Sequence, residues 1–344
     1  MTRVPDRRRA PAKVLPPLGP GAEFDLVRRF LERASAAGRA DVRVGPGDDC
    51  AVVAGDGIAL SSDLSVEGVH FRRDWLSFRE IGSRAAAAAL SDLAAVAARP
   101  IGVLASLALP QRDAGTHAVQ LMEGVRRSVE HAGGTLLGGD LARSPGPLTI
   151  DIVAVGECAR PVLRSGAASG DEVWVTGELG AAAAYVEQRL EGTAADPAAR
   201  ARYARPEPRV HEARWLAERG LPSAALDLSD GLAGDAAHLS AASGVAILLV
   251  PDLIPIHPAA RRHAADGEAA LRLALAGGED YELCFTAAPG RVELCEADFE
   301  RTFGVRLTCV GRAAGGDGVW WVDAEGHRRP LELRGYRHFE EGGG

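Results

Sequence analysis

The residues of this chain that could do chemistry are aspartates beside glycine or a hydroxyl residue, most of them at boundaries between predicted elements. They occur in six strings: Gly47-Asp48-Asp49, Ser61-Ser62-Asp63, Leu90-Ser91-Asp92, Gly138-Gly139-Asp140, Asp227-Leu228-Ser229-Asp230-Gly231 and Gly277-Gly278-Glu279-Asp280. Carboxylate and hydroxyl oxygens, with no Cys/His ligand set among them, are donors that Mg²⁺ prefers. Taken alone, each string is explained equally well by turn and helix-cap chemistry.

Asp92 is the most informative of these aspartates. A predicted helix at 79–98 places it on one face with apolar residues at spacings of three or four: Ile81, Ala85, Ala88 and Val96. A carboxylate in an apolar stripe needs a cation or a strong donor, because burying it unpaired is costly. We therefore favour a metal ion as its partner over the alternative, a cap on a neighbouring loop.

Two further features could contact an anion. His70 closely follows the Ser61-Ser62-Asp63 string, whereas the other histidines lack paired metal-ligand spacing and are interpreted as structural or exposed. Gly177-Glu178-Leu179-Gly180 lies between a predicted strand and a predicted helix, where backbone N–H groups could cradle phosphate. A Gly-rich turn with a purely structural role is the preferred interpretation of that string.

Composition excludes several function classes. Lys13 is the only lysine, which excludes a P-loop, a protein-kinase phosphate lysine and Schiff-base chemistry. The net charge of −8 argues against a nucleic-acid partner. No stretch approaches the ~20 apolar residues of a membrane span. The five cysteines form no C-x-x-C pair, which fits a reducing, cytoplasmic setting.

The elements around these strings alternate between strands and helices, which predicts an α/β and α+β fold. In the first half we predict helices at 23–38, 79–98 and 114–132 and strands at 50–53, 58–62, 101–109 and 148–155. In the second half we predict strands at 173–176, 245–250, 281–286, 307–310 and 319–322, and helices from 179 and near 207–219, 231–242 and 266–275. The segment 192–201 is interpreted as a surface excursion.

A length of 344 residues suggests two domains. The predicted organisation is a disordered tail (1–22), a first domain with a mixed sheet (23–157), a linker (158–168) and a C-terminal α+β domain (169–340).

In order along the chain, these strings resemble the thiamine-monophosphate kinase family of the aminoimidazole-ribonucleotide-synthetase-like superfamily. The similarity covers roughly 23–339 and is specific as an ordered set: GDDCAVV (47–53), SSDLSVEGVHF (61–71), ALSDLAAVAARP (89–100), LLGGD (136–140), LRSGA (163–167), DLSDGLAGDAAHLSAASG (227–244), LAGGEDYELCFT (275–286) and GYRHF (335–339).

The resemblance implies a two-domain fold with ATP in the cleft and a homodimer formed through the first domain's sheet. It implies direct transfer of the ATP γ-phosphoryl group to thiamine monophosphate, the last step of thiamine diphosphate biosynthesis. A lysine-free site can do this if Mg²⁺ bridges the phosphates, and no strong general base is needed because the acceptor is already a phosphate oxygen.

The resemblance also assigns roles to residues by motif. The implied ligands of several Mg²⁺ ions are Asp49, Ser61, Ser62, Asp63, Asp92, Asp140, Asp227 and Asp230, and the predicted catalytic residues among them are Asp92, Asp140, Asp227 and Asp230. The implied ATP contacts are Gly139 and Asp140, in a predicted turn, with Arg164 and Ser229. The implied contacts to thiamine monophosphate are His70, Glu279 and Tyr336.

Some positions depart from the family pattern. Ala89 and Leu141 stand where Asn and Thr are common, which puts local hydrogen bonds of the metal or nucleotide site in doubt. Three alternatives stay open: another ATP-using member of the superfamily, a non-catalytic nucleotide-binding regulator, and a metal-dependent phosphatase.

Overall fold

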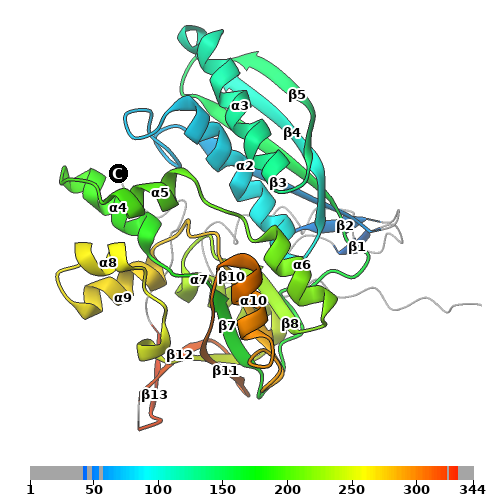
Figure 1. The fold of residues 1–344 in the computed structure, drawn as a ribbon, viewed down its shortest axis with the longest axis vertical. Helices are drawn as coiled ribbons and strands as arrows, with labels where there is room; N and C mark the ends of the chain where they lie inside the picture. Colours follow the sequence, from blue (N-terminus) through cyan, green and yellow to red (C-terminus); the bar gives the residue numbers. More distant parts are fainter. Residues whose placement is uncertain (1–41, 45–48, 54–56, 324, 332–344) are drawn as a thin grey trace, which may run out of the picture.

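The computed structural model describes residues 42–44, 49–53, 57–323 and 325–331. Within them the chain forms two β-sheets, each accompanied by helices (Figure 1). This confirms the predicted α/β and α+β class. The predicted tail (1–22) and the predicted helix at 23–38 lie outside the described residues, and the predicted domain limits stay predictions.

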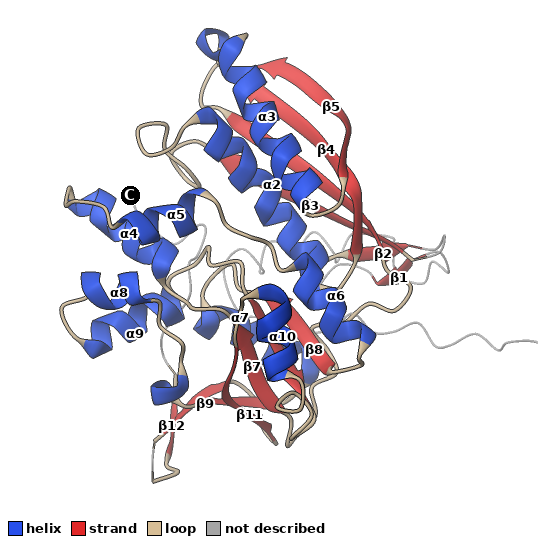
Figure 2. Cartoon of the chain, viewed as in Figure 1, coloured by secondary structure: helices blue, strands red, loops and turns tan. Residues whose placement is uncertain are grey.

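The first sheet has six strands in the order β1-β2-β3-β6-β4-β5. Their bounds are β1 Val42–Val44, β2 Ala51–Val53, β3 Ile58–Val66, β4 Arg99–Leu109, β5 Thr135–Arg143 and β6 Thr149–Glu157. Two long helices, α2 (Phe78–Ala95) and α3 (Thr116–His131), cross one face of this sheet (Figure 2). The side chains on the opposite face, which we call the outer face, include Ser62, Leu64, Leu104 and Asp151.

The helix α2 carries the predicted apolar stripe. Ser77 begins it with a capping box, in which the Ser77 N–H donates to Glu80 Oε2 at 2.9 Å. Its backbone touches that of α3, because a Cβ added to Gly82 would lie 2.0 Å from the Leu121 carbonyl oxygen. The helix ends at Ala95, three residues before the predicted end at 98.

The second sheet has seven strands in the order β13-β12-β9-β11-β7-β10-β8. Its strands are β7 Glu172–Thr176, β8 Pro222–Asp227, β9 Ala246–Leu249, β10 Leu283–Ala287, β11 Leu307–Ala314, β12 Val319–Val322 and β13 Arg328–Pro330. Its helices are α4 Ala181–Glu191, α5 Pro197–Ala204, α6 Val210–Glu218, α7 Leu232–Ser243, α8 Pro258–His263, α9 Gly267–Ala276 and α10 Glu296–Phe303. Short 3₁₀ turns occur at Gln111–Asp113 and Pro251–Leu253.

Several elements were not predicted. The interpretation of 192–201 as a surface excursion is wrong for its second half, where α5 begins at Pro197 after an N-cap in which Asp196 accepts the Ala198 N–H at 2.8 Å. The strands β5 and β8 were missed because glycines and small residues give them weak strand periodicity. No described helix is long and apolar enough to cross a bilayer.

The two halves are joined by packing around α2. This helix contacts α6 and β8 of the second half as well as its own sheet. An aromatic cluster extends the contact: Trp75 meets the rings of Tyr185 and Tyr203 edge-on at 6.1 and 6.3 Å. One continuous core therefore includes Trp75, Tyr185 and Tyr203, and it packs the segment before α2 against α4 and α5 of the second half.

Candidate functional site

Three aspartates converge where the two sheets meet. Asp49 lies two residues before β2, Asp92 is in the last turn of α2, and Asp227 is the last residue of β8. Each offers one carboxylate oxygen, and these atoms lie within 4.8 Å of one another. We call these residues the central cluster. Three carboxylates at this separation cannot all stay ionised without a cation beside them, so the cluster has the donors and spacing of a hard-metal site.

The electrostatics of the central cluster support this. Burial, followed by the charges of Asp227 and Asp49, raises the pKa of Asp92 well above its ordinary value. Burial, followed by the charge of Asp49, raises the pKa of Asp227 to about 8. Arg164 supplies a positive charge, donating from Nε and Nη2 to the two oxygens of Asp49 at 2.7 Å each. Asp92, which interrupts the apolar stripe of α2, therefore belongs to a buried group of carboxylates.

A second group of ligand atoms lies on α7 and the turn before it. Asp230, Asp235 and His238 each place one ligand atom within 4.8 Å of the others. Asp235 also fixes the turn, because its Oδ2 accepts the Asp230 N–H at 3.1 Å. Burial, followed by the charge of Arg164, lowers the pKa of His238 to about 4, so its ring is neutral at pH 7 and able to ligate a metal.

Asp235 and His238 were not predicted as site residues. They stand three apart in a predicted helix and follow Asp230 closely, which puts both on one helix face. That spacing is the signal that could have found them.

The residues Ser61, Ser62 and Asp63 alternate along β3 and therefore face opposite sides of the sheet. Ser61 points towards α2 and donates its hydroxyl to Asp92. Asp63 shares that side, and burial raises its pKa to about 6 although Arg84 opposes the rise. Ser62 faces the outer face, where it donates to Asp151 Oδ1 at 2.8 Å. Ser61 and Asp63 thus lie on the central cluster's side of the sheet, and Ser62 does not.

Asp140 lies on the outer face too, because it pairs with Ser106 of β4, which in turn pairs with Asp151 of β6. Its side chain is exposed, so within this chain the structure groups it with Ser62 and Asp151, away from the central cluster. The predicted turn at Gly139-Asp140 is wrong, since both residues lie inside β5. Gly139 is needed there because an added Cβ would lie 1.8 Å from the Ala105 carbonyl oxygen.

The loop before β10 carries Glu279. It is held to the turn after β8 by two backbone hydrogen bonds, from the Glu279 N–H to the Ser229 carbonyl at 2.8 Å and from the Tyr281 N–H to the Leu228 carbonyl at 2.9 Å. The Glu279 carboxylate forms an ion pair with Arg84 of α2. The structure therefore places Ser229, Glu279 and Asp230 beside one another. The third predicted acceptor contact, Tyr336, lies outside the described residues.

The Gly177-Glu178-Leu179-Gly180 turn leads into α4 and has a structural role, as the sequence predicts, in preference to cradling a phosphate. The N-terminus of α4 that follows it is capped by a carboxylate of the protein, because the Gly180 N–H donates to Asp280 Oδ2 at 2.7 Å. Burial raises the pKa of Asp280 to about 7.

Comparison with known proteins decides the family. A model of the AIR synthase related protein, N-terminal domain, matches residues 47–158. The thiamine-monophosphate kinase of Salmonella typhimurium is 36% identical over 329 residues, which span 92% of this chain and 98% of the relative. That of Rhodopirellula baltica is 36% identical over 310 residues, spanning 87% and 92%. This chain belongs to the thiamine-monophosphate kinase family.

A solved structure of this kinase family agrees with the fold. The complex described as "AaThiL complexed with AMPPCP and TMP" superposes with a TM-score of 0.77 at 29% sequence identity, covering 93% of this chain and 97% of that one. The predicted aminoimidazole-ribonucleotide-synthetase-like fold is thereby confirmed.

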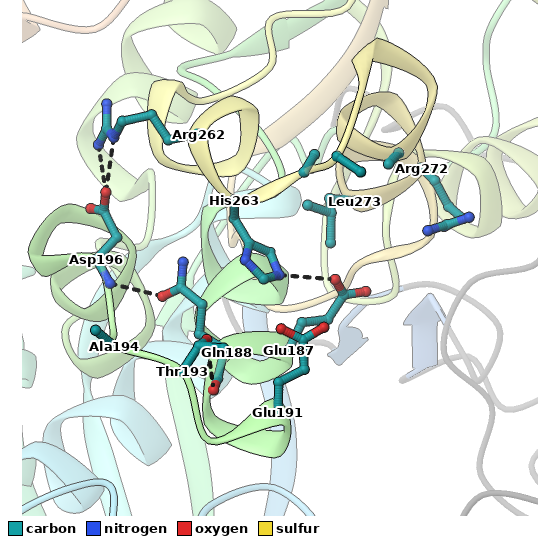
Figure 3. Close-up of a pocket in the computed structure, with 13 residues that line it drawn as sticks. Glu187, Gln188, Glu191, Thr193, Ala194, Asp196, Arg262, His263, Arg272 and Leu273 are labelled. Atoms are coloured by element: carbon teal, nitrogen blue, oxygen red, sulfur yellow. Dashed lines mark hydrogen bonds and ion pairs between the residues drawn. The ribbon is translucent and has the colours of Figure 1, made fainter.

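A polar cavity of about 590 Å³ lies apart from the clusters of this kinase-family chain, between α4, α8 and α9 (Figure 3). In its wall, Glu187 and Glu191 of α4 lie beside His263 of α8, with His263 Nε2 3.2 Å from Glu187 Oε2. Its wall also carries the ion pair between Arg262 and Asp196. None of the residues predicted from the sequence to bind ATP, metal or thiamine monophosphate is in this wall.

Proposed function

We propose that this chain transfers the γ-phosphoryl group of ATP to thiamine monophosphate and so makes thiamine diphosphate. The observation that carries the proposal is the convergence of Asp49, Asp92 and Asp227 from both halves of the chain onto one point, beside the Ser229 and Glu279 loops. Membership of the kinase family supports the same reaction. Direct transfer joins an acceptor phosphate oxygen to Pγ and breaks the bond from Pγ to the β–γ bridging oxygen, releasing ADP.

The residues present fit several Mg²⁺ ions. Asp49, Asp92 and Asp227 would hold one set, with Ser61 and Asp63 next to them, and Asp230 would serve a further ion. Ser62 and Asp140 face the other side of the sheet, so within this chain they would bind an ion on the outer face and not the ions of the central cluster. When bound, Mg²⁺ neutralises phosphate oxygens and holds them in line for transfer. The described part of the site contains no lysine, so the chain's own positive charges there come from arginine.

Arg164 would serve ATP, together with Ser229 and the Gly139-Asp140 segment. Its fork of donors matches a phosphate as well as it matches the carboxylate of Asp49. His70, Glu279 and Tyr336 would contact thiamine monophosphate. The His70 ring already has a fixed orientation, because its Nδ1 accepts the Val66 N–H at 3.0 Å. An acceptor that is itself a phosphate oxygen needs orientation from these groups more than it needs a base.

We further propose a homodimer that pairs through the outer face. Three leucines on β3, β4 and β5 of that sheet are strongly exposed: Leu64 at 53%, Leu104 at 40% and Leu137 at 46%. Leucines gathered on one face of a sheet are unusual for a surface in contact with water and are typical of a buried interface. A cytoplasmic location fits the free thiols of Cys158, Cys284, Cys295 and Cys309.

The reaction is tested by chromatography of thiamine diphosphate after incubating the purified protein with ATP, Mg²⁺ and thiamine monophosphate. One control omits Mg²⁺, and another replaces the acceptor with free thiamine. Product that needs both Mg²⁺ and the monophosphate establishes the reaction. Free phosphate released from the monophosphate without ATP would instead identify a phosphatase. Binding of ATP without any product would identify a different acceptor or a regulatory relative.

A further inference from the structure

Arg84 lies between the two halves of the proposed acceptor site. His70 follows β3 in the first half, and Glu279 precedes β10 in the second half. Arg84 projects from α2, and its side chain is only 5% exposed. A charge so deeply buried needs partners that compensate it.

The guanidinium of Arg84 has three contacts in two directions. Nη1 donates to the Tyr203 carbonyl at 2.6 Å, and the guanidinium carbon stands 3.9 Å from the centre of the Tyr203 ring. Nη2 forms the ion pair with the Glu279 carboxylate. The Tyr203 hydroxyl continues the chain of contacts by donating to the His70 carbonyl at 3.2 Å. Arg84 thus reaches Glu279 directly and His70 through Tyr203.

The backbone around Glu279 is fixed independently of Arg84. Glu279 has a φ of +72°, a left-handed conformation that a non-glycine residue adopts only when its surroundings impose it. The Asp280 carboxylate is anchored at Gly180, and Glu282 is anchored by Arg209. With the backbone fixed in this way, the direction of the Glu279 side chain is set by its ion pair with Arg84.

We propose that Arg84 is a positioning residue of the acceptor subsite, which fixes the Glu279 carboxylate and the His70 segment for thiamine monophosphate and leaves ATP affinity unchanged. The inference rests on the proposed function. The positioning role requires arginine, because a lysine ammonium is a point charge that cannot reach the Tyr203 carbonyl, the Tyr203 ring and Glu279 at once.

The test compares Arg84→Lys with wild type in steady-state kinetics and thermal unfolding. We expect the KM for thiamine monophosphate to rise about 10- to 100-fold, as when a charge-assisted hydrogen bond is lost, while the KM for ATP stays within about twofold. The matched control is Arg79→Lys, on the same helix but 53% exposed and paired with Glu123, which should change neither constant. A lower unfolding temperature with both KM values unchanged, or an equal rise in both, would assign Arg84 a structural role and overturn the proposal.

A second variant keeps the proposal testable if Arg84→Lys does not fold. Tyr203→Phe keeps the ring and removes only the hydrogen bond to the His70 carbonyl, so it should raise the KM for thiamine monophosphate about three- to tenfold without affecting ATP. An unchanged KM for the acceptor would contradict the relay from Arg84 to His70. A wild-type protein that neither binds nor phosphorylates thiamine monophosphate would overturn the proposed function itself, a result distinct from an active wild type with unaffected variants.

Discussion

Arg164 donates two parallel hydrogen bonds to Asp49, each 2.7 Å long, from Nε to Oδ2 and from Nη2 to Oδ1. A residue proposed to serve ATP is therefore paired with a residue proposed to hold metal. The side chain of Asp49 is fully buried and that of Arg164 is 18% exposed, so the pair is shielded from solvent. Arg164 provides the cluster with a cation of the chain's own, which bound Mg²⁺ could supplement or replace.

Replacing Arg164 by glutamine should destabilise the protein most when no divalent cation is present. Removing one partner of a buried ion pair costs about 3–5 kcal/mol, because the other charge is left without compensation. Mg²⁺ should recover much of that loss by neutralising the same carboxylates. Denaturant unfolding in EDTA and in Mg²⁺ measures both values, with the exposed Arg160→Gln as control. An equal loss under the two conditions would show that Arg164 does not compensate the cluster.

Asp92→Asn should lower turnover and at the same time stabilise the metal-free protein. Its raised pKa means that folding disfavours the ionised form at neutral pH, so a neutral amide removes that penalty. Loss of a metal ligand worth several kcal/mol in the transition state should reduce kcat by roughly a hundredfold or more. Kinetics and unfolding in EDTA test the two effects together. Asp298→Asn, at an aspartate 62% exposed, is the control. Near-wild-type turnover in Asp92→Asn would remove Asp92 from the metal site.

The periodicity of α2 shows how far the sequence can lead. Asp92 is conspicuous in the sequence because an aspartate in an apolar stripe demands a partner, and the structure buries it beside Asp49 and Asp227 with a hydrogen bond from Ser61. Arg84 stands on the same stripe, three residues after Ile81 and four before Ala88, so the same argument was available for it. The partners of Arg84 could not be predicted in this way. Tyr203 and Glu279 lie 119 and 195 residues after Arg84 in the sequence and contact it only because the two halves of the chain pack together.

Other parts of the site could not be predicted because they depend on strand register. Gly138-Gly139-Asp140 has the composition of a turn, yet β4 accepts it as a strand partner because glycine permits the close approach to Ala105. Once it is a strand, pairing with Ser106 decides that Asp140 belongs to the outer face. A local pattern carries no information about which strand lies next to it.

Glu282→Gln should destabilise the second half of the chain in a pH-dependent way. Glu282 is fully buried, and Arg209 holds it through two hydrogen bonds of 2.6 Å. Burial alone would raise its pKa, but Arg209 and Arg202 outweigh burial and lower it from 4.5 to about 2. A lowered pKa contributes stability that is complete above about pH 4.5 and is lost as the pH falls towards about 2.

At pH 7 the Glu282→Gln variant should lose about 3–5 kcal/mol of its free energy of unfolding, since the Arg209 charge stays buried without its partner. Below pH 4.5 the difference in free energy of unfolding between wild type and variant should narrow by up to about 1.4 kcal/mol per pH unit. The reason is that the unfolded wild type takes up a proton there. Urea unfolding at several pH values measures the gap. Glu218→Gln, at a side chain 65% exposed, serves as control. A gap that is constant between pH 7 and pH 3.5 would contradict the lowered pKa of Glu282.

A charge placed on the outer face should separate the proposed dimer. Leu104 is 40% exposed, and its strand neighbour Val153 is half-buried, so Leu104→Lys puts an ammonium at the proposed interface without disturbing the core beneath α2. Light scattering coupled to size-exclusion chromatography should report a dimer for wild type and a monomer for the variant. Leu294→Lys, at a leucine 87% exposed in the other half, should remain dimeric. A wild-type monomer, or a dimer that survives Leu104→Lys together with Leu64→Lys, would show that the outer face does not pair two copies.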